Sequence, residues 1–197
     1  VTVPANGVAV ALKAPPLSGA LLRPPGILSE IADFINATAV RPQPPLAVAG
    51  ALSLAATVCG RHYESASGLR SNLYVVGVGP TGCGKNHARS VIKKILHQAD
   101  LDGLLGGEEI ASGQAILARV AATPSALFQL DEFGLLREAV ANPNSGNHVA
   151  AIMGILMKLF SSAGDVYIGT EYADQEKRPR VTIEYPCVNL HATTTPD

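Results

Sequence analysis

The chain has 197 residues and a mass of 20.4 kDa, enough for one domain with a buried sheet and short for two independent domains. Hydrophobic residues make up 47% and charged residues only 16%, which excludes a disordered chain. The net charge of -1 argues against a protein that binds nucleic acid through bulk positive charge.

The cysteines and the apolar runs indicate a cytoplasmic protein. Cys59, Cys83 and Cys187 are far apart and include no CxxC pair, which excludes a disulfide framework and a cysteine zinc site. The longest apolar run, 46–59, is shorter than the roughly 20 residues of a bilayer crossing, so we expect a buried helix and no membrane contact. Because the chain opens on Val1 without a signal sequence, we expect an excised fragment.

The prolines and the hydrophobic periodicity divide the chain into three parts. Repeated prolines predict an arm or linker over 1–25. We expect a helical lead-in over 26–70, with Ile27, Ile31, Phe34 and Ile35 on one face of its first helix and 46–59 as its second. Residues 71–197 then form the core, which we expect to be truncated at its C-terminus.

Within this core the patterns alternate between strands and helices. Apolar, β-branched runs predict strands at 73–78 and 125–130, and helical spacing predicts helices at 87–99 and 113–122, the latter capped by Ser112. A helix over 147–163 and strands at 165–172, 180–185 and 187–192 complete the predicted elements.

A glycine-rich loop follows the first predicted strand. Its residues match G-x-x-x-x-G-K: Gly79, Pro80, Thr81, Gly82, Cys83, Gly84 and Lys85, followed by Asn86 and His87. Glycines let successive backbone amides face phosphate oxygens, and the N-terminus of the next helix adds positive potential. The order of strand, loop and helix therefore predicts phosphate binding, with Lys85 on the β and γ phosphates, rather than a simple glycine turn.

Asn86 departs from this motif, because a Ser or Thr hydroxyl normally ligates Mg²⁺ there. An amide oxygen is also a hard ligand, so we expect Asn86 and a later acid to hold Mg²⁺, with altered metal affinity or hydrolysis. The same glycines also spell G-x-G-x-x-G (Gly77, Gly79, Gly82), with Asp100 or Asp102 about 20 residues on. This alternative dinucleotide interpretation leaves Lys85 without a role.

Two adjacent carboxylates end the strand predicted at 125–130. In a nucleotide site Asp131 would serve the metal, while Glu132 would orient and polarise the attacking water. Such a pair can also be a solvated strand end. The presence of Glu132 favours hydrolysis over phosphotransfer.

Further candidates lie towards the C-terminus. Thr194 and Thr195, at the end of the last predicted strand, are candidate sensors of the γ phosphate if that strand neighbours the one carrying Asp131. His191 fits a packed histidine better than a catalyst. As candidates for contacting a neighbour's phosphate or a DNA backbone, the sequence offers Arg178, Arg180 and, less strongly, Arg137.

The segments GPTGCGKNHARSVIKKIL, SGQAILARV, ALFQLDEFG and NLHATTTP together resemble the ATPase part of phage and prophage primase-helicase proteins, over about residues 25–197. The resemblance implies a P-loop NTPase of α/β class, a RecA-like or AAA+ three-layer α/β/α sandwich preceded by helices. It implies ATP and Mg²⁺ as ligands, a homo-oligomeric ring, single-stranded DNA as a partner and a bacterial or prophage origin. The expected function is ATP-driven translocation in DNA replication.

Two other functions remain open from the sequence. A regulatory or scaffold module could use ATP to switch its assembly without motor activity, which Asn86 favours. A small-molecule kinase would need an acceptor pocket and a lid, and the sequence identifies neither.

Overall fold

The computed structural model describes residues 17–134, 136, 138, 147–174, 176–177 and 179–196, with the backbone alone for 147–149. Its centre is a three-stranded parallel sheet in the order β1-β5-β2. These strands are β1 (Tyr74–Val78), β2 (Ser125–Leu130) and β5 (Cys187–Thr194). The last strand of the chain thus lies between the other two, pairing Gly77 with Thr193 and Leu130 with Ala192.

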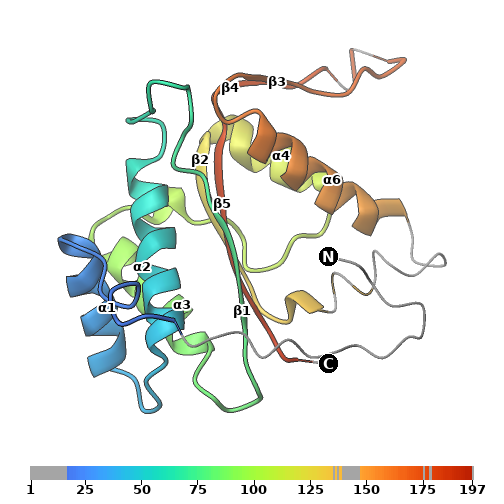
Figure 1. The fold of residues 1–197 in the computed structure, drawn as a ribbon. Coiled ribbons are helices and arrows are strands. Elements are labelled where there is room, and N and C mark those ends of the chain that lie inside the picture. The colour runs from blue at the N-terminus through green and yellow to red at the C-terminus, as the bar shows by residue number, and fades with distance from the viewer. Residues whose placement is uncertain are drawn as a thin grey trace, which may run out of the picture.

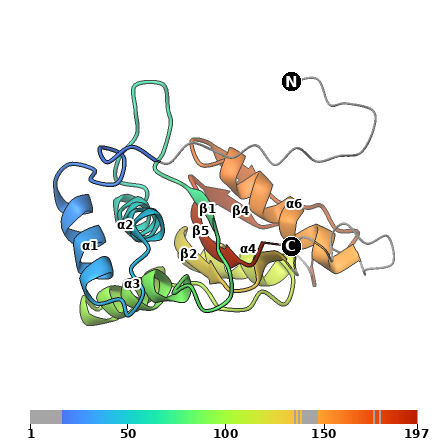
Figure 2. The same cartoon turned by 60° about the horizontal axis from the view of Figure 1, so that its bottom comes forward.

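Helices cover both faces of this sheet (Figures 1 and 2). On one side lie α1 (Ile27–Ala37), α2 (Pro44–Cys59) and α3 (Asn86–Gln98). On the other lie α4 (Gly113–Ala122) and α6 (Asn147–Ser161). The arrangement confirms an α/β fold, and the parallel strands direct all three carboxyl ends to the same edge.

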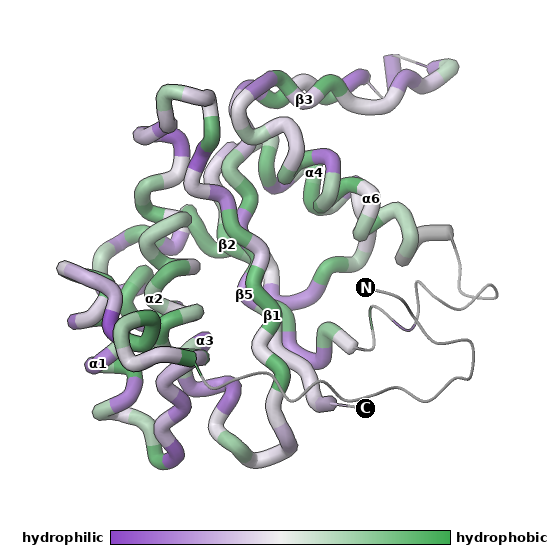
Figure 3. Tube along the Cα trace, viewed as in Figure 1, coloured by the Kyte–Doolittle hydropathy of each residue, from purple (hydrophilic) through white to green (hydrophobic). Residues whose placement is uncertain are grey.

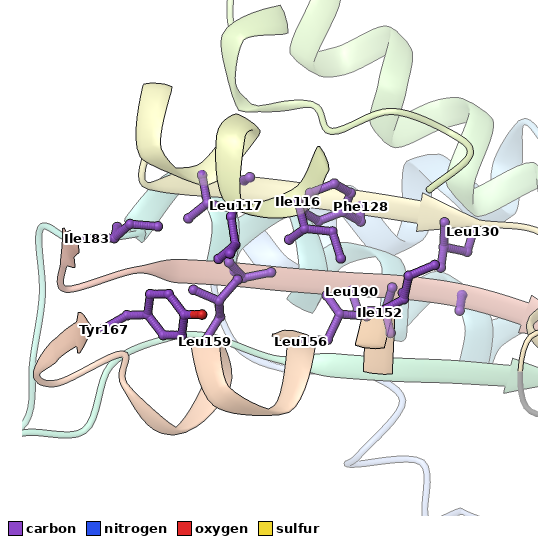
Figure 4. Close-up of a cluster of buried hydrophobic side chains, with 14 residues drawn as sticks. Ile116, Leu117, Phe128, Leu130, Ile152, Leu156, Leu159, Tyr167, Ile183 and Leu190 are labelled. Carbon is purple, nitrogen blue, oxygen red and sulfur yellow. The ribbon is translucent and has the colours of Figure 1, made fainter. Parts of the chain in front are cut away.

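The main sheet has an apolar core on each of its two faces. Val188, Leu190 and Ala192 pack with α4 and α6, together with Phe128 of β2 (Figure 4). On the other face Leu127 packs with Leu54, Ile92 and Leu96 from α2 and α3. Hydrophobic segments therefore run through the middle of the molecule (Figure 3), as burial on both faces of a parallel sheet requires.

The lead-in helices form where the periodicity predicts them, with two differences. The second begins at Pro44, earlier than predicted, because prolines fit the first helical turn, where the backbone N–H has no helical partner. In the first, Ala32 and Ile35 are buried while Ile27 and Phe34 are exposed. Ala32 and Ile35 pack with small residues of α2 and α3, and Ile31 of the predicted face is partly buried beside them.

Between the first strand and residue 130, the two α-helices and the strand β2 agree closely with the prediction. Ser112 caps α4, its hydroxyl accepting a hydrogen bond from the amide of Ala115 at 3.2 Å. The short 3-10 helix Asp102–Leu104, which follows α3, is not predicted by the periodicity.

The strands predicted at 165–172 and 180–185 are shorter than expected and lie outside the main sheet. They form an antiparallel hairpin of β3 (Val166–Ile168) and β4 (Thr182–Glu184). Because β4 leads directly into β5, this hairpin lies beyond the amino ends of the main strands (Figure 1). Among the described residues, no helix combines the length and the apolar composition that a bilayer crossing demands.

Candidate functional site

The glycine-rich loop leaves the carboxyl end of β1 and turns directly into α3. The amide of Gly79 still donates to Thr194 O at 3.0 Å, and a tight turn follows in which Cys83 N donates to Pro80 O at 3.2 Å. Gly82 and Gly84 have φ values of 75° and 95°, a region that side chains with a Cβ rarely occupy. The loop conformation thus depends on these two glycines.

Lys85 lies at the junction of this loop with α3. Its side chain is only 7% exposed, and its ammonium group donates to Gly79 O at 3.4 Å, across the loop. The first turn of α3 begins at Asn86, and the amides of a first helical turn have no partner within the helix. A buried cation, helix amides and a glycine loop together favour an anion.

Asp131 brings the acidic strand end to this loop. Its Oδ2 accepts from Asn86 Nδ2 at 2.9 Å and from Arg89 Nη2 at 3.1 Å. Its Oδ1 accepts from the amide of Glu132 at 3.1 Å and from the hydroxyl of Thr193 at 3.0 Å. One carboxylate therefore joins β2, β5 and α3.

This network lowers the pKa of the Asp131 carboxyl. Desolvation is the largest single influence and raises the pKa of this carboxyl. The hydrogen bond from Thr193, the charge of Arg89 and the hydrogen bonds from Glu132 and Asn86 outweigh it, so the pKa lies below its usual value.

The donor types near Asp131 fit Mg²⁺, which prefers carboxylate and amide oxygens and shares its shell with substrate phosphates. The Asn86 amide oxygen, the predicted ligand, lies 3.2 Å from the Thr193 hydroxyl. That hydroxyl has one proton, so the Asn86 oxygen and Asp131 compete for it. The residues present thus fit a nucleotide-bound magnesium ion in chemistry, while their oxygens already contact one another.

Glu132 follows Asp131 with an exposed side chain and a φ of 50°. This left-handed conformation is uncommon for a residue other than glycine. It turns the chain sharply at the carboxyl end of β2, so that the two adjacent acids differ in surroundings. The side chain of Asp131 is 39% exposed and accepts four hydrogen bonds, and Glu132 is exposed beside it.

The threonines of β5 divide between the two faces of the sheet. Thr193 faces Asn86 and Asp131, whereas the hydroxyl of Thr194 accepts from Gly134 N at 3.1 Å. Thr194 and Thr195 line a cavity of about 400 Å³ with Phe133. The predicted sensor residues therefore lie at the expected edge, but the threonine joined to Asp131 is Thr193.

The connection between α1 and α2 contacts the glycine-rich loop, which the sequence analysis did not anticipate. Arg41 Nη1 donates to Gly82 O at 2.5 Å, and Gln43 Nε2 donates to Cys83 O at 3.0 Å. Thr38 Oγ1 lies 2.9 Å from Nε2 of His87. A Cβ on Gly84 would lie 2.7 Å from Arg41 O, so this connection also limits the space around the loop.

Two further polar residues lie beneath the site. Gln129 Nε2 donates to Arg89 O at 3.1 Å and so ties β2 to α3. His191, in the central strand, is fully buried, and among the described residues neither of its ring nitrogens has a hydrogen-bond partner. Burial and then the charge of Arg89 lower the pKa of His191 to about 4, which agrees with a packed, neutral histidine.

Other predicted candidates lie elsewhere or outside the described residues. Arg180 donates to Glu171 Oε1 at 2.6 Å beside the β3–β4 hairpin, at the opposite end of the sheet from the loop. Arg137 and Arg178 lie outside the described residues. Asp100 and Asp102 follow the far end of α3, roughly 18 Å along the helix from the loop, which disfavours the dinucleotide interpretation.

No protein family model matches this chain, and the comparison with curated proteins found no match either.

Proposed function

We propose that this chain binds and hydrolyses ATP at the carboxyl edge of its parallel sheet. One observation carries the proposal: the glycine-rich loop with Lys85, the acid Asp131 and the hydroxyl of Thr193 converge there from three neighbouring strands. Ligands of open α/β sheets bind at the carboxyl ends of the strands.

Each residue has a defined role in this proposal. The loop amides and the buried ammonium of Lys85 hold the β and γ phosphates. Asp131 and Asn86 would hold a magnesium ion, which when bound would neutralise charge on the phosphates. Glu132, whose carboxylate is exposed beside Asp131, orients and polarises the attacking water.

The wider assignment is to the motor domain of a phage or prophage replicative helicase or primase-helicase. It is supported by the resemblance of the four segments that include the loop and the acidic strand end. Single-stranded DNA and further copies of the chain in a ring are the partners that this assignment entails. The expected location of such a protein is the bacterial cytoplasm.

One observation favours a second candidate, a nucleotide-switched regulatory module. Asn86 occupies the usual hydroxyl position, and its amide group donates to Asp131. A site arranged in this way can bind nucleotide and still turn it over slowly, as a switch requires.

The test compares wild type with Lys85→Ala and with the control Lys94→Ala, which removes an exposed lysine from α3. Lys85→Ala should weaken ATP binding by about tenfold or more, the loss expected when a charged hydrogen bond to phosphate is removed. The control should match wild type. Equal ATP binding by all three proteins contradicts the proposal, and ATP turnover measured with and without single-stranded DNA separates the motor from the switch.

A further inference from the structure

The carboxylate of Asp131 has no acceptor position left. An ionised carboxylate offers about four lone-pair positions. Asp131 uses two on Oδ1, for Glu132 N and Thr193 Oγ1, and two on Oδ2, for Asn86 Nδ2 and Arg89 Nη2. The side chain is 39% exposed, but a cation that takes one of these acceptor positions directly must displace one of the four donors.

The four donors differ in how they can accommodate a cation. The amide of Glu132 is part of the backbone, and it donates to the side chain of the residue directly before it. Asn86 and Thr193 each carry an oxygen that can turn towards a cation by a side-chain rotation. Arg89 has no acceptor atom and carries the same sign of charge as the cation, so it is the donor that must leave.

Arg89 is also held in place for this contact. It lies one helical turn after Asn86 on α3, with its side chain 17% exposed, and its backbone oxygen accepts from Gln129 of β2. A residue of β2, the strand that ends in Asp131, thus helps to fix the position of Arg89.

We infer that Arg89 is a positioning residue that competes with a divalent cation for Asp131, so that the site excludes the free cation. This inference rests on the proposed nucleotide site and deepens it. A cation bound to nucleotide brings phosphate ligands of its own, which offset the loss of the Arg89 contact. A free cation has only the oxygens of the protein and must displace Arg89 without that help.

The test uses Mn²⁺ alone as the probe and needs no nucleotide. NMR follows the paramagnetic broadening of the Asp131 and Glu132 amide signals in wild type, Arg89→Met and Lys93→Met. The samples contain about 0.15 M salt, because exposed charges are then screened beyond about 8 Å. Methionine keeps the length of the side chain and removes the charge and the donors. Lys93→Met is the matched control, because it removes one positive charge from the next turn of α3, where Lys93 pairs with Glu108.

We expect selective broadening in Arg89→Met at a Mn²⁺ concentration about fivefold lower than in wild type, a factor that corresponds to ~1 kcal/mol. The control should stay within about twofold of wild type. The inference is overturned if wild type and Arg89→Met need the same Mn²⁺ concentration for broadening, or if Lys93→Met lowers that concentration as much as Arg89→Met does. It is also overturned if neither wild type nor Arg89→Met shows selective broadening. Failure of the proposed function would appear separately, as wild type that binds no ATP.

Discussion

Asp131 and Glu132 are adjacent in the sequence but have different surroundings. Asp131 accepts hydrogen bonds from side chains of α3 and β5, whereas Glu132 follows it in a turn with a φ of 50°. We expect Glu132→Gln to retain ATP and to lower its hydrolysis by about 10² to 10⁴, the range of a general base. Asp131→Asn should lose both binding and hydrolysis, because it disrupts the network around Asn86 and Thr193.

Nucleotide titration and phosphate release measured on the same samples distinguish these two phenotypes. Glu184→Gln, the same chemical change at an exposed position of β4, serves as the control. If Glu132→Gln hydrolyses ATP at the wild-type rate, Glu132 has no role in positioning water.

His191 predicts a specific dependence of stability on pH. Its pKa is about 4 in the folded chain against 6.5 for an exposed histidine, so between these values the unfolded chain takes up a proton that the folded chain does not. The free energy of unfolding should therefore fall as pH drops from 6.5 to 4, by at most roughly 3 kcal/mol. Below pH 4 this contribution changes no further.

Urea unfolding at several pH values checks this prediction with His191→Leu. Because neither ring nitrogen of His191 has a hydrogen-bond partner in the part of the chain that the structure describes, the variant should be about as stable as wild type at pH 7 and should lose this part of the pH dependence. His62→Leu, at an exposed turn, should keep the wild-type slope. An unchanged slope in His191→Leu would assign the pH dependence to other groups.

At the level of elements, the connection between α1 and α2 supports the glycine-rich loop from outside. Arg41, Gln43 and Thr38 contact the loop or the first turn of α3. An ordered loop loses less conformational freedom when a phosphate binds, which favours affinity. The helices placed before the loop in the sequence therefore contribute to the candidate site as well as to the core.

Arg41→Ala tests this support. We expect nucleotide affinity to fall about threefold to tenfold, the effect of one hydrogen bond of roughly 1 kcal/mol. Thermal unfolding should change little, because Arg41 is exposed. Arg23→Ala, which removes an arginine from an exposed ion pair with Asp33, is the control. Equal affinities for the two variants would show that the connection does not order the loop.

At the level of the whole molecule, the strand that leads into the glycine-rich loop lies at an edge of the described sheet. The strand β1 has β5 as its neighbour on one side in the described sheet, and Val76 and Val78 on this strand are 40% and 60% exposed. The arginine candidate Arg180 lies beside the β3–β4 hairpin, at the opposite end of the sheet from the site of its own chain.

A ring assembly, as proposed, predicts that turnover depends on association. An arginine supplied by a neighbour stabilises transition-state charge and can raise turnover by about 10³ to 10⁵. The rate of ATP hydrolysis per chain should therefore rise with protein concentration over the range in which sedimentation shows association. A rate that is independent of concentration, in samples that sedimentation shows to be monomeric, would mean that each chain carries a complete site.

Several features of this protein follow from the sequence by itself. Hydrophobic periodicity predicts α3 and α4 almost to the residue, and the apolar run ending in Asp131 predicts β2. The glycine-rich loop is predicted between a strand and a helix, where it lies. These features depend on residues close together in the chain, where backbone geometry and local burial decide the outcome.

The tertiary structure alone decided which residues surround Asp131. It placed β5 between β1 and β2, and the strand alternation then directed Thr193, rather than Thr194, to the acid. It also brought Arg41 to the loop and Arg89 to Asp131. A linear pattern shows neither the order of strands nor contacts between distant segments, because these depend on how the helices and strands pack.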